Sequence, residues 1–218
     1  GNKFGYASGG GGSTARGPGG GGGLAGRVAG LGVEGLGDGH HKVEEAALRL
    51  LGVLSDRKPG AVAGVLEGVL GRLIPMLGSK RLAAEASALL SALTSQHGAG
   101  HALPHLLRGL DDKAAGSRHA CLIALTPLVP SLAPKDARHV CARLPLLSSD
   151  KGEGARRAFS EACASLRQHH AGALIEALAL LPPQPQQQCL RLLCQDLPGL
   201  AQDVSAHLAG GAAPPAPD

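Results

Sequence analysis

Three histidines at helical spacing are candidate metal ligands in this sequence. His97, His101 and His105 stand four residues apart, a spacing that could place them on one helix face and let them hold a metal ion. Two glycines and Pro104 interrupt that stretch, and no carboxylate or cysteine lies beside it in sequence. We therefore interpret the three side chains as a solvated histidine face and predict no metal site.

A glycine motif raises the question of nucleotide binding. Residues 30–35 read G-L-G-V-E-G and match the G-x-G-x-x-G pattern, which needs a preceding strand so that the turn can present backbone N–H groups to a pyrophosphate. A glycine tract precedes them instead, and residues 1–39 hold 18 glycines, so a chance match is expected. The Walker A, H-E-x-x-H, G-x-S-x-G and EF-hand motifs are missing from the sequence, as is an evident nucleophile–base arrangement. We predict no enzyme, no cofactor and no small-molecule substrate.

The cysteines give no stronger signal for a site. Cys189 and Cys194 are spaced C-x₄-C without a matching pair, whereas a zinc site would want four ligands. Cys121 and Cys163 fall inside apolar stripes and are expected to be small core residues. The five cysteines are an odd number without short-spaced pairs, which favours a reduced intracellular compartment.

Basic residues cluster at three expected turns between helices. In a repeat protein such turns line up along one edge, so we expect this edge to meet an acidic partner, either ribosomal RNA or an acidic protein face. The alternative is an ordinary solvated edge. The candidate partner-binding residues are Lys80, Arg81, Lys113, Arg118, His119, Lys151, Arg156 and Arg157.

The elements that must position these residues are predicted to be helices throughout. Of the 218 residues, 44% are hydrophobic and only 1% aromatic, which argues against an aromatic-rich sandwich or propeller and against a stacking platform for single-stranded nucleic acid. Apolar stripes recur at helical spacing, and period-two alternation is missing. The stripes are Val43, Ala47, Leu50 and Leu54; Val62, Val65, Val69 and Leu73; Leu82, Ala86, Leu89 and Leu93; Val140, Leu144 and Leu147; and Leu174, Leu178 and Leu181.

The helices are expected to form repeats. Asp112 precedes Arg118 by six residues and Asp150 precedes Arg156 by six, and the two sets lie 38 residues apart. A loop acid and an arginine on the next helix can tie successive units together by a charge-assisted hydrogen bond. The period fits HEAT or armadillo repeats, so we predict an all-α solenoid of about five helix pairs. A non-repetitive helical bundle is the alternative.

The predicted solenoid has low-complexity flanks. We expect a Gly-rich flexible segment over residues 1–37, with a frayed helix from Leu24 as its one ordered part, then the solenoid over 38–209 and a Pro-rich disordered tail over 210–218. The chain opens at Gly1 rather than Met, as a fragment would. The uncharged stretch 86–107 is too polar for a membrane span, and the N-terminus has no signal-peptide core.

Several short motifs follow one another in a distinctive order from Asp38 to about Gly210. They are K-V-E-E-A at 42–46, the Ala-rich helix at 82–90, H-L-L-R-G-L at 105–110, S-R-H-A at 117–120 with the apolar helix at 122–128, S-D-K at 149–151, Arg156-Arg157, and L-R-Q-H at 166–169. In this order of features the segment resembles the C-terminal HEAT region of the general-control translational activator family. This chain has Ala115 where the family has Trp, and Ala120 where it has Gly.

The resemblance implies a non-enzymatic scaffold of the cytoplasm. It would bind translating or collided ribosomes and recruit the RWD domain of the kinase that phosphorylates the alpha subunit of initiation factor 2, in translational control under stress. One alternative is a TOG-type tubulin-binding HEAT array, which also carries Lys and Arg in its turns but usually has a Trp in the first turn, absent here. The other is an importin-type transport receptor, which would need more repeats.

Overall fold

The computed structural model describes residues 23–210, and within that range the chain is helical without strands. The predicted all-α class is therefore confirmed. The elements follow one another as α1 Leu24–Gly35, α2 His41–Arg57, α3 Pro59–Ala63, α4 Leu66–Met76, α5 Ala83–His97, α6 Ala99–Leu110, α7 Ala115–Leu125, the 3-10 helix η1 Thr126–Ser131, α8 Pro134–Cys141, α9 Leu144–Ser148, α10 Glu153–Ala179, α11 Pro183–Leu193 and α12 Leu200–Gly210.

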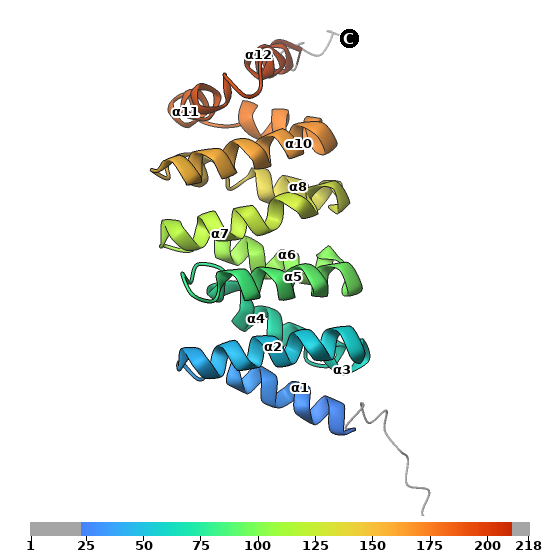
Figure 1. Ribbon diagram of the computed structural model, residues 1–218. Coiled ribbons are helices and arrows are strands. Elements are labelled where there is room, and N and C mark those ends of the chain that lie inside the picture. Colours follow the sequence, from blue (N-terminus) through green and yellow to red (C-terminus); the bar gives the residue numbers. More distant parts are fainter. Residues whose placement is uncertain (1–22, 211–218) are drawn as a thin grey trace, which may run out of the picture.

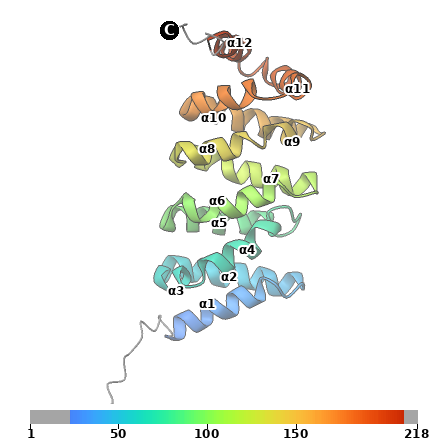
Figure 2. The ribbon, with the colours of Figure 1, turned by 180° about the vertical axis from the view of Figure 1, so that it is seen from behind.

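The helices stack as successive pairs in a two-layered solenoid (Figure 1). The front layer holds α2, α5, α7 and the first part of α10, and the view from behind in Figure 2 shows α4, α6 and α8. Along each layer neighbours pack on one another, α2 on α5, α7 on α10, and α4 on α6. Counted along the chain, α2 pairs with α3–α4, α5 with α6, α7–η1 with α8–α9, the two parts of α10 with each other, and α11 with α12. The expected five pairs are thus present, preceded by α1.

The fourth helix pair is formed by the two parts of one long element, α10. Helical hydrogen bonding runs through α10 from Glu153 to Ala179, but His170 has a non-helical backbone with φ −141° and ψ 43°. Its ring Nε2 lies 3.0 Å from the carbonyl oxygen of Val129 in the preceding repeat. The chain therefore turns at His170 without the Pro or Gly that usually marks a break.

Helix α1 begins at Leu24, where a frayed helix was expected at the end of the Gly-rich segment. It packs on α2, with Ala29 fully buried and Leu36 only 2% exposed. A Cβ on Gly32 would lie 2.9 Å from the side chain of Leu51, so this glycine lets the two helices approach closely. The G-x-G-x-x-G stretch accordingly belongs to a helix rather than to a strand-to-helix turn. Residues 1–22 and 211–218, which carry the rest of the flexible-segment and tail predictions, lie outside the described range.

The core is built from Leu, Ala and Val, as expected. The stripe Leu82, Ala86, Leu89 and Leu93 of α5 is buried along its whole length, at 5%, 0%, 3% and 1% exposure. In α2 the buried face is shifted from the predicted stripe: Ala47, Leu48, Leu51 and Ser55 are buried, and Val43 is exposed. The reason is that α2 packs on α1, α3 and α5 at once, so its neighbours select the buried face. No helix of the described part is long and apolar enough to cross a membrane.

Candidate binding edge

The turns that connect one helix pair to the next lie along one edge of the solenoid, the left edge in Figure 1. These are residues 77–82 before α5, 111–114 before α7 and 149–152 before α10. Lys80, Arg81, Lys113 and Lys151 are exposed there. Arg156, one turn into α10, is exposed beside them. Five of the candidate residues therefore point to solvent along or next to one edge.

The turn at 77–82 has no acidic residue, and the acids of the other two turns make contacts within the protein. Asp111 pairs with Arg143 of the second layer, 2.8 Å from Oδ2 to Nη2. Asp112 accepts a hydrogen bond of 2.7 Å from the backbone N–H of Ala114 at the start of α7, and Asp150 is held by an arginine described below. The five exposed cations, by contrast, form no ion pair with any described residue. The edge thus presents five cations without an ion-pair partner (Lys80, Arg81, Lys113, Lys151 and Arg156, hereafter the basic edge), next to the exposed Glu153, which forms no ion pair either.

Arg118 has a different role from the one expected, because it is only 8% exposed and all its contacts are internal. Its Nε donates to Asp150 Oδ2 at 3.0 Å, and Nη2 pairs with Oδ1 of the same carboxylate. Nη1 donates to the carbonyl oxygens of Asp112 at 2.6 Å and Lys113 at 3.0 Å. The hydrogen bond with Asp150 raises the pKa of Arg118 above its ordinary value. Arg118 is therefore a tie between two repeats and is not available to a partner.

This tie follows a longer spacing than the one expected from the sequence. The acid and arginine that meet are 32 residues apart, not six, because Arg118 reaches forward to the turn of the next pair. Arg167 repeats the forward reach with Asp203, 2.9 Å from Nη2 to Oδ2. The corresponding Arg156 has no acid in the next turn and stays free.

The two remaining candidates make internal contacts. His119 is half-buried against the start of α10, where a Cβ on Gly154 would lie 3.1 Å from the imidazole ring. Arg157 is exposed, but its Nε donates to Glu161 Oε1 at 2.8 Å on the same helix. That hydrogen bond raises the pKa of Arg157. Neither side chain belongs to the uncompensated charge of the edge.

The histidines form a cluster with a partner from another helix. His105 Nε2 lies 2.9 Å and His101 Nδ1 lies 3.5 Å from the carboxylate of Glu67 on α4. The hydrogen bond with His105, followed by that with His101, lowers the pKa of Glu67. Glu67 was missed in the sequence because it lies 38 residues from His105, one repeat away. His97 ends α5 and stays apart, and no group of three potential ligands in the described range is placed to hold a metal ion.

The thiols are mostly inert. Cys121, Cys141, Cys163 and Cys189 are buried and Cys194 is exposed. Burial raises the pKa of Cys121 to about 11 and that of Cys141 to about 12. Since the thiolate is the reactive form, these buried cysteines serve as core residues, as predicted for Cys121 and Cys163.

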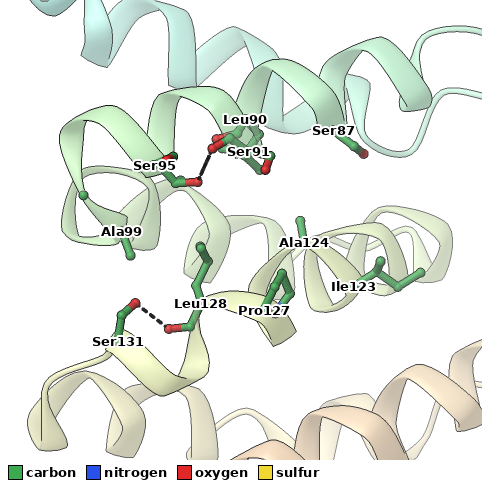
Figure 3. A pocket seen from close by; sticks show the side chains of 12 residues that line it. Ser87, Leu90, Ser91, Ser95, Ala99, Ile123, Ala124, Pro127, Leu128 and Ser131 are labelled. Carbon is green, nitrogen blue, oxygen red and sulfur yellow. Dashed lines mark hydrogen bonds between the residues drawn. The ribbon is translucent and has the colours of Figure 1, made fainter.

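The front layer contains a groove of about 540 Å³ between α5 and the α7–η1 segment (Figure 3). Its walls combine Leu90, Ile123 and Leu128 with several hydroxyl groups. Two of these hydroxyls are already bonded to their own helices: Thr94 Oγ1 to the Ser91 carbonyl at 3.0 Å, and Ser131 Oγ to the Leu128 carbonyl at 2.8 Å. No His, Cys, Asp or Glu lines it, so this groove holds none of the usual acid–base or metal-binding groups.

Comparison with known proteins supports the fold. No protein-family model and no curated protein matches the sequence. Among solved structures, the chain is similar to one from crescerin, which uses a TOG domain array to regulate microtubules in the primary cilium; the TM-score is 0.62 at 20% identity, covering 78% of this chain and 74% of that one. It also matches a designed armadillo repeat protein in complex with the peptide (KR)4, with a TM-score of 0.47 at 17% identity, over 84% of this chain and 89% of that one. The chain has a HEAT/armadillo-like α-repeat fold.

Proposed function

We propose that this chain is a non-enzymatic HEAT-type scaffold that binds an acidic protein surface through its basic edge. The observation that carries the proposal is the asymmetry of charge at the turns. Asp111, Asp112 and Asp150 contact groups within the protein, whereas Lys80, Lys113 and Lys151 are exposed and form no ion pair with any described residue. Such a row of like charges speeds association with a surface of opposite charge, and added salt weakens this attraction.

Tubulin is the first partner to test. The fold similarity to a TOG domain array that regulates microtubules motivates this choice. The repeated turns of a solenoid suit it, because they offer a long contact surface with fixed spacing between basic groups. The first turn of this chain has no Trp, so recognition here would rely on charge more than on an aromatic anchor.

The second candidate partner is the RWD domain of the kinase that phosphorylates initiation factor 2 alpha, with the ribosome and its RNA as the platform. It is supported by the sequence resemblance over residues 38–210 alone. Some residues that carry the resemblance, Arg118 and Asp150 among them, tie repeats together and would recur in solenoids with other partners.

A pull-down with the full chain as bait tests both partners at once. The edge variant Lys80→Glu, Lys113→Glu and Lys151→Glu reverses three unpaired charges. A matched variant, Arg57→Glu, Lys58→Glu and Lys135→Glu, changes the same total charge at exposed positions of the opposite edge.

We expect tubulin capture to be lost with the edge variant and kept with the matched one. Loss with the matched variant alone would move the binding surface to the opposite edge and refute the proposal as stated. Capture of the RWD domain without tubulin would favour the translational role. Capture of neither protein would refute both candidate partners.

A further inference from the structure

The bend in α10 at His170 makes the two parts of this helix into the fourth pair of the solenoid. The first part lies in the front layer, and the second part returns behind it toward the left edge of Figure 1, where α11 begins (Figures 1 and 2). A straight helix of 27 residues would instead be about 40 Å long and would carry the chain toward the opposite edge. The direction of α11 and α12 therefore depends on this bend.

The usual backbone causes of a sharp bend do not explain this one. Such bends arise at proline, at glycine, or where a side chain intrudes on the helix, and α10 contains no proline. Gly172 follows the bend by two residues, but a Cβ built on it would meet no atom within 4 Å. The lack of a side chain at Gly172 is therefore not what the bend requires.

The apolar residues of α10 favour a bend but do not fix its position. Leu166 lies before His170, Leu174 and Leu178 lie after it, and all three leucines are fully buried. In a straight helix of 3.6 residues per turn, Leu174 would stand about 80° and Leu178 about 120° around the axis from Leu166. A straight α10 could therefore not bury the three leucines against one layer of neighbours.

The ring of His170 connects the bend to the preceding repeat. Its Nε2 lies 3.0 Å from the carbonyl oxygen of Val129, a fully buried residue of η1. A carbonyl oxygen can only accept a hydrogen bond, so Nε2 carries the proton and donates it. The same oxygen accepts the backbone N–H of Leu132 at 3.2 Å, which holds it in place at the end of η1.

We propose that His170 is a positioning residue, whose hydrogen bond to Val129 holds α10 in its bent form and fixes the direction of the last helix pair. Burial of the leucines supplies the tendency to bend, and the side chain of His170 selects the residue at which the bend occurs. The inference concerns the shape of the solenoid and does not rest on any proposed partner.

Two spin labels on the full chain measure the bend as a distance. Cys194, which lies beyond the bend, is exposed while the other four cysteines are buried, so it takes the first label without any mutation. The variant Ser87→Cys provides the second position on an exposed site of α5. Pulsed electron–electron double resonance then gives the distribution of the distance between the labels, and we expect one narrow distance when His170 is present.

The variant His170→Ala removes the donor. It should raise the population of other distances about fivefold, because a hydrogen bond of ordinary net strength changes an equilibrium by about that factor. His170→Gln carries an amide N–H the same number of bonds from Cα and should restore the single distance. His169→Ala is the matched control, since this neighbouring histidine is exposed and forms no hydrogen bond with any described residue.

An unchanged distance in His170→Ala would overturn the inference and assign the bend to the packing of the leucines alone. An equal change in His169→Ala, or no recovery in His170→Gln, would overturn it as well. Thermal unfolding followed by circular dichroism accompanies each variant, and a lower Tm with an unchanged distance would show a contact that stabilises without positioning. If His170→Ala loses its helix signal, His170→Leu repeats the test with an apolar side chain of similar size and should show the same added distances.

Discussion

Removing the carboxylate of Asp150 should weaken the solenoid by about 3 kcal/mol. The side chains of Arg118 and Asp150 are 10% and 5% exposed, and breaking a buried ion pair by removing one partner costs about 3–5 kcal/mol. In Asp150→Ala the guanidinium keeps its two carbonyl acceptors, at Asp112 and Lys113, so the lower end of that range applies. For a chain of 218 residues, this loss corresponds to a fall in Tm of about 6–12 °C.

Circular dichroism at the helix signal, followed through thermal unfolding, measures this change. Arg157→Ala is the control, because its pair with Glu161 on the same helix is exposed to solvent and should contribute little to the free energy of unfolding. The double variant Arg118→Met/Asp150→Leu should recover most of the loss, since it leaves no buried charge unpaired. If Asp150→Ala unfolds within about 1 °C of the control, on the scale of Tm change per kcal/mol used above, the pair does not tie the repeats.

Three further outcomes are expected. Gly109→Ala should lower the free energy of unfolding by about 1–3 kcal/mol in a urea titration, because the new Cβ would meet the Cys121 sulfur at 2.3 Å; an unchanged midpoint would contradict this contact. The pKa of Glu67 is lowered from 4.5 by its hydrogen bond with His105. This interaction therefore stabilises the fold above pH 4.5, and its contribution to stability is lost as the pH falls through the pKa of Glu67 in the folded state. The Tm difference between wild type and Glu67→Gln should accordingly shrink on acidification, and a difference that grows would reverse the sign. A thiol reagent should titrate one cysteine per native chain, Cys194, and all five after unfolding; more than one fast thiol would show that the core opens.

Helical periodicity was a sound guide wherever a helix has one dominant partner layer. The α5 stripe was predicted position by position, because an amphipathic helix with a single apolar face can bury it in one way only. In α2 the prediction was displaced, since contacts on three sides bury residues that the period alone would leave outside. The start of α1 at Leu24 was expected, but only as a frayed helix. Its packing could not be predicted, because glycine has low helix propensity and Gly32 favours the helix only through the close approach to Leu51.

The candidate site was predictable as a set of residue types but not as a set of roles. The cations at the turns could be found in the sequence, because the turn positions follow from the helix breaks. Arg157 is paired locally with Glu161, as the i,i+4 spacing allows, but the pairing of Arg118 depends on an acid one repeat away and cannot be read from the local sequence. Arg118 and Arg156 look alike in sequence, yet one is buried against Asp150 and the other is exposed.

The sequence by itself determined the helical class, the repeat period and the positions of most turns, because these depend on local propensity and on the spacing of apolar residues along one chain segment. The tertiary structure alone decided the pairing of charges and the faces that remain exposed. Ion pairs such as Arg118 with Asp150 and Glu67 with His105 join residues 32 and 38 positions apart. Their formation depends on how neighbouring repeats stack, and stacking is a property of the packed core rather than of any one segment.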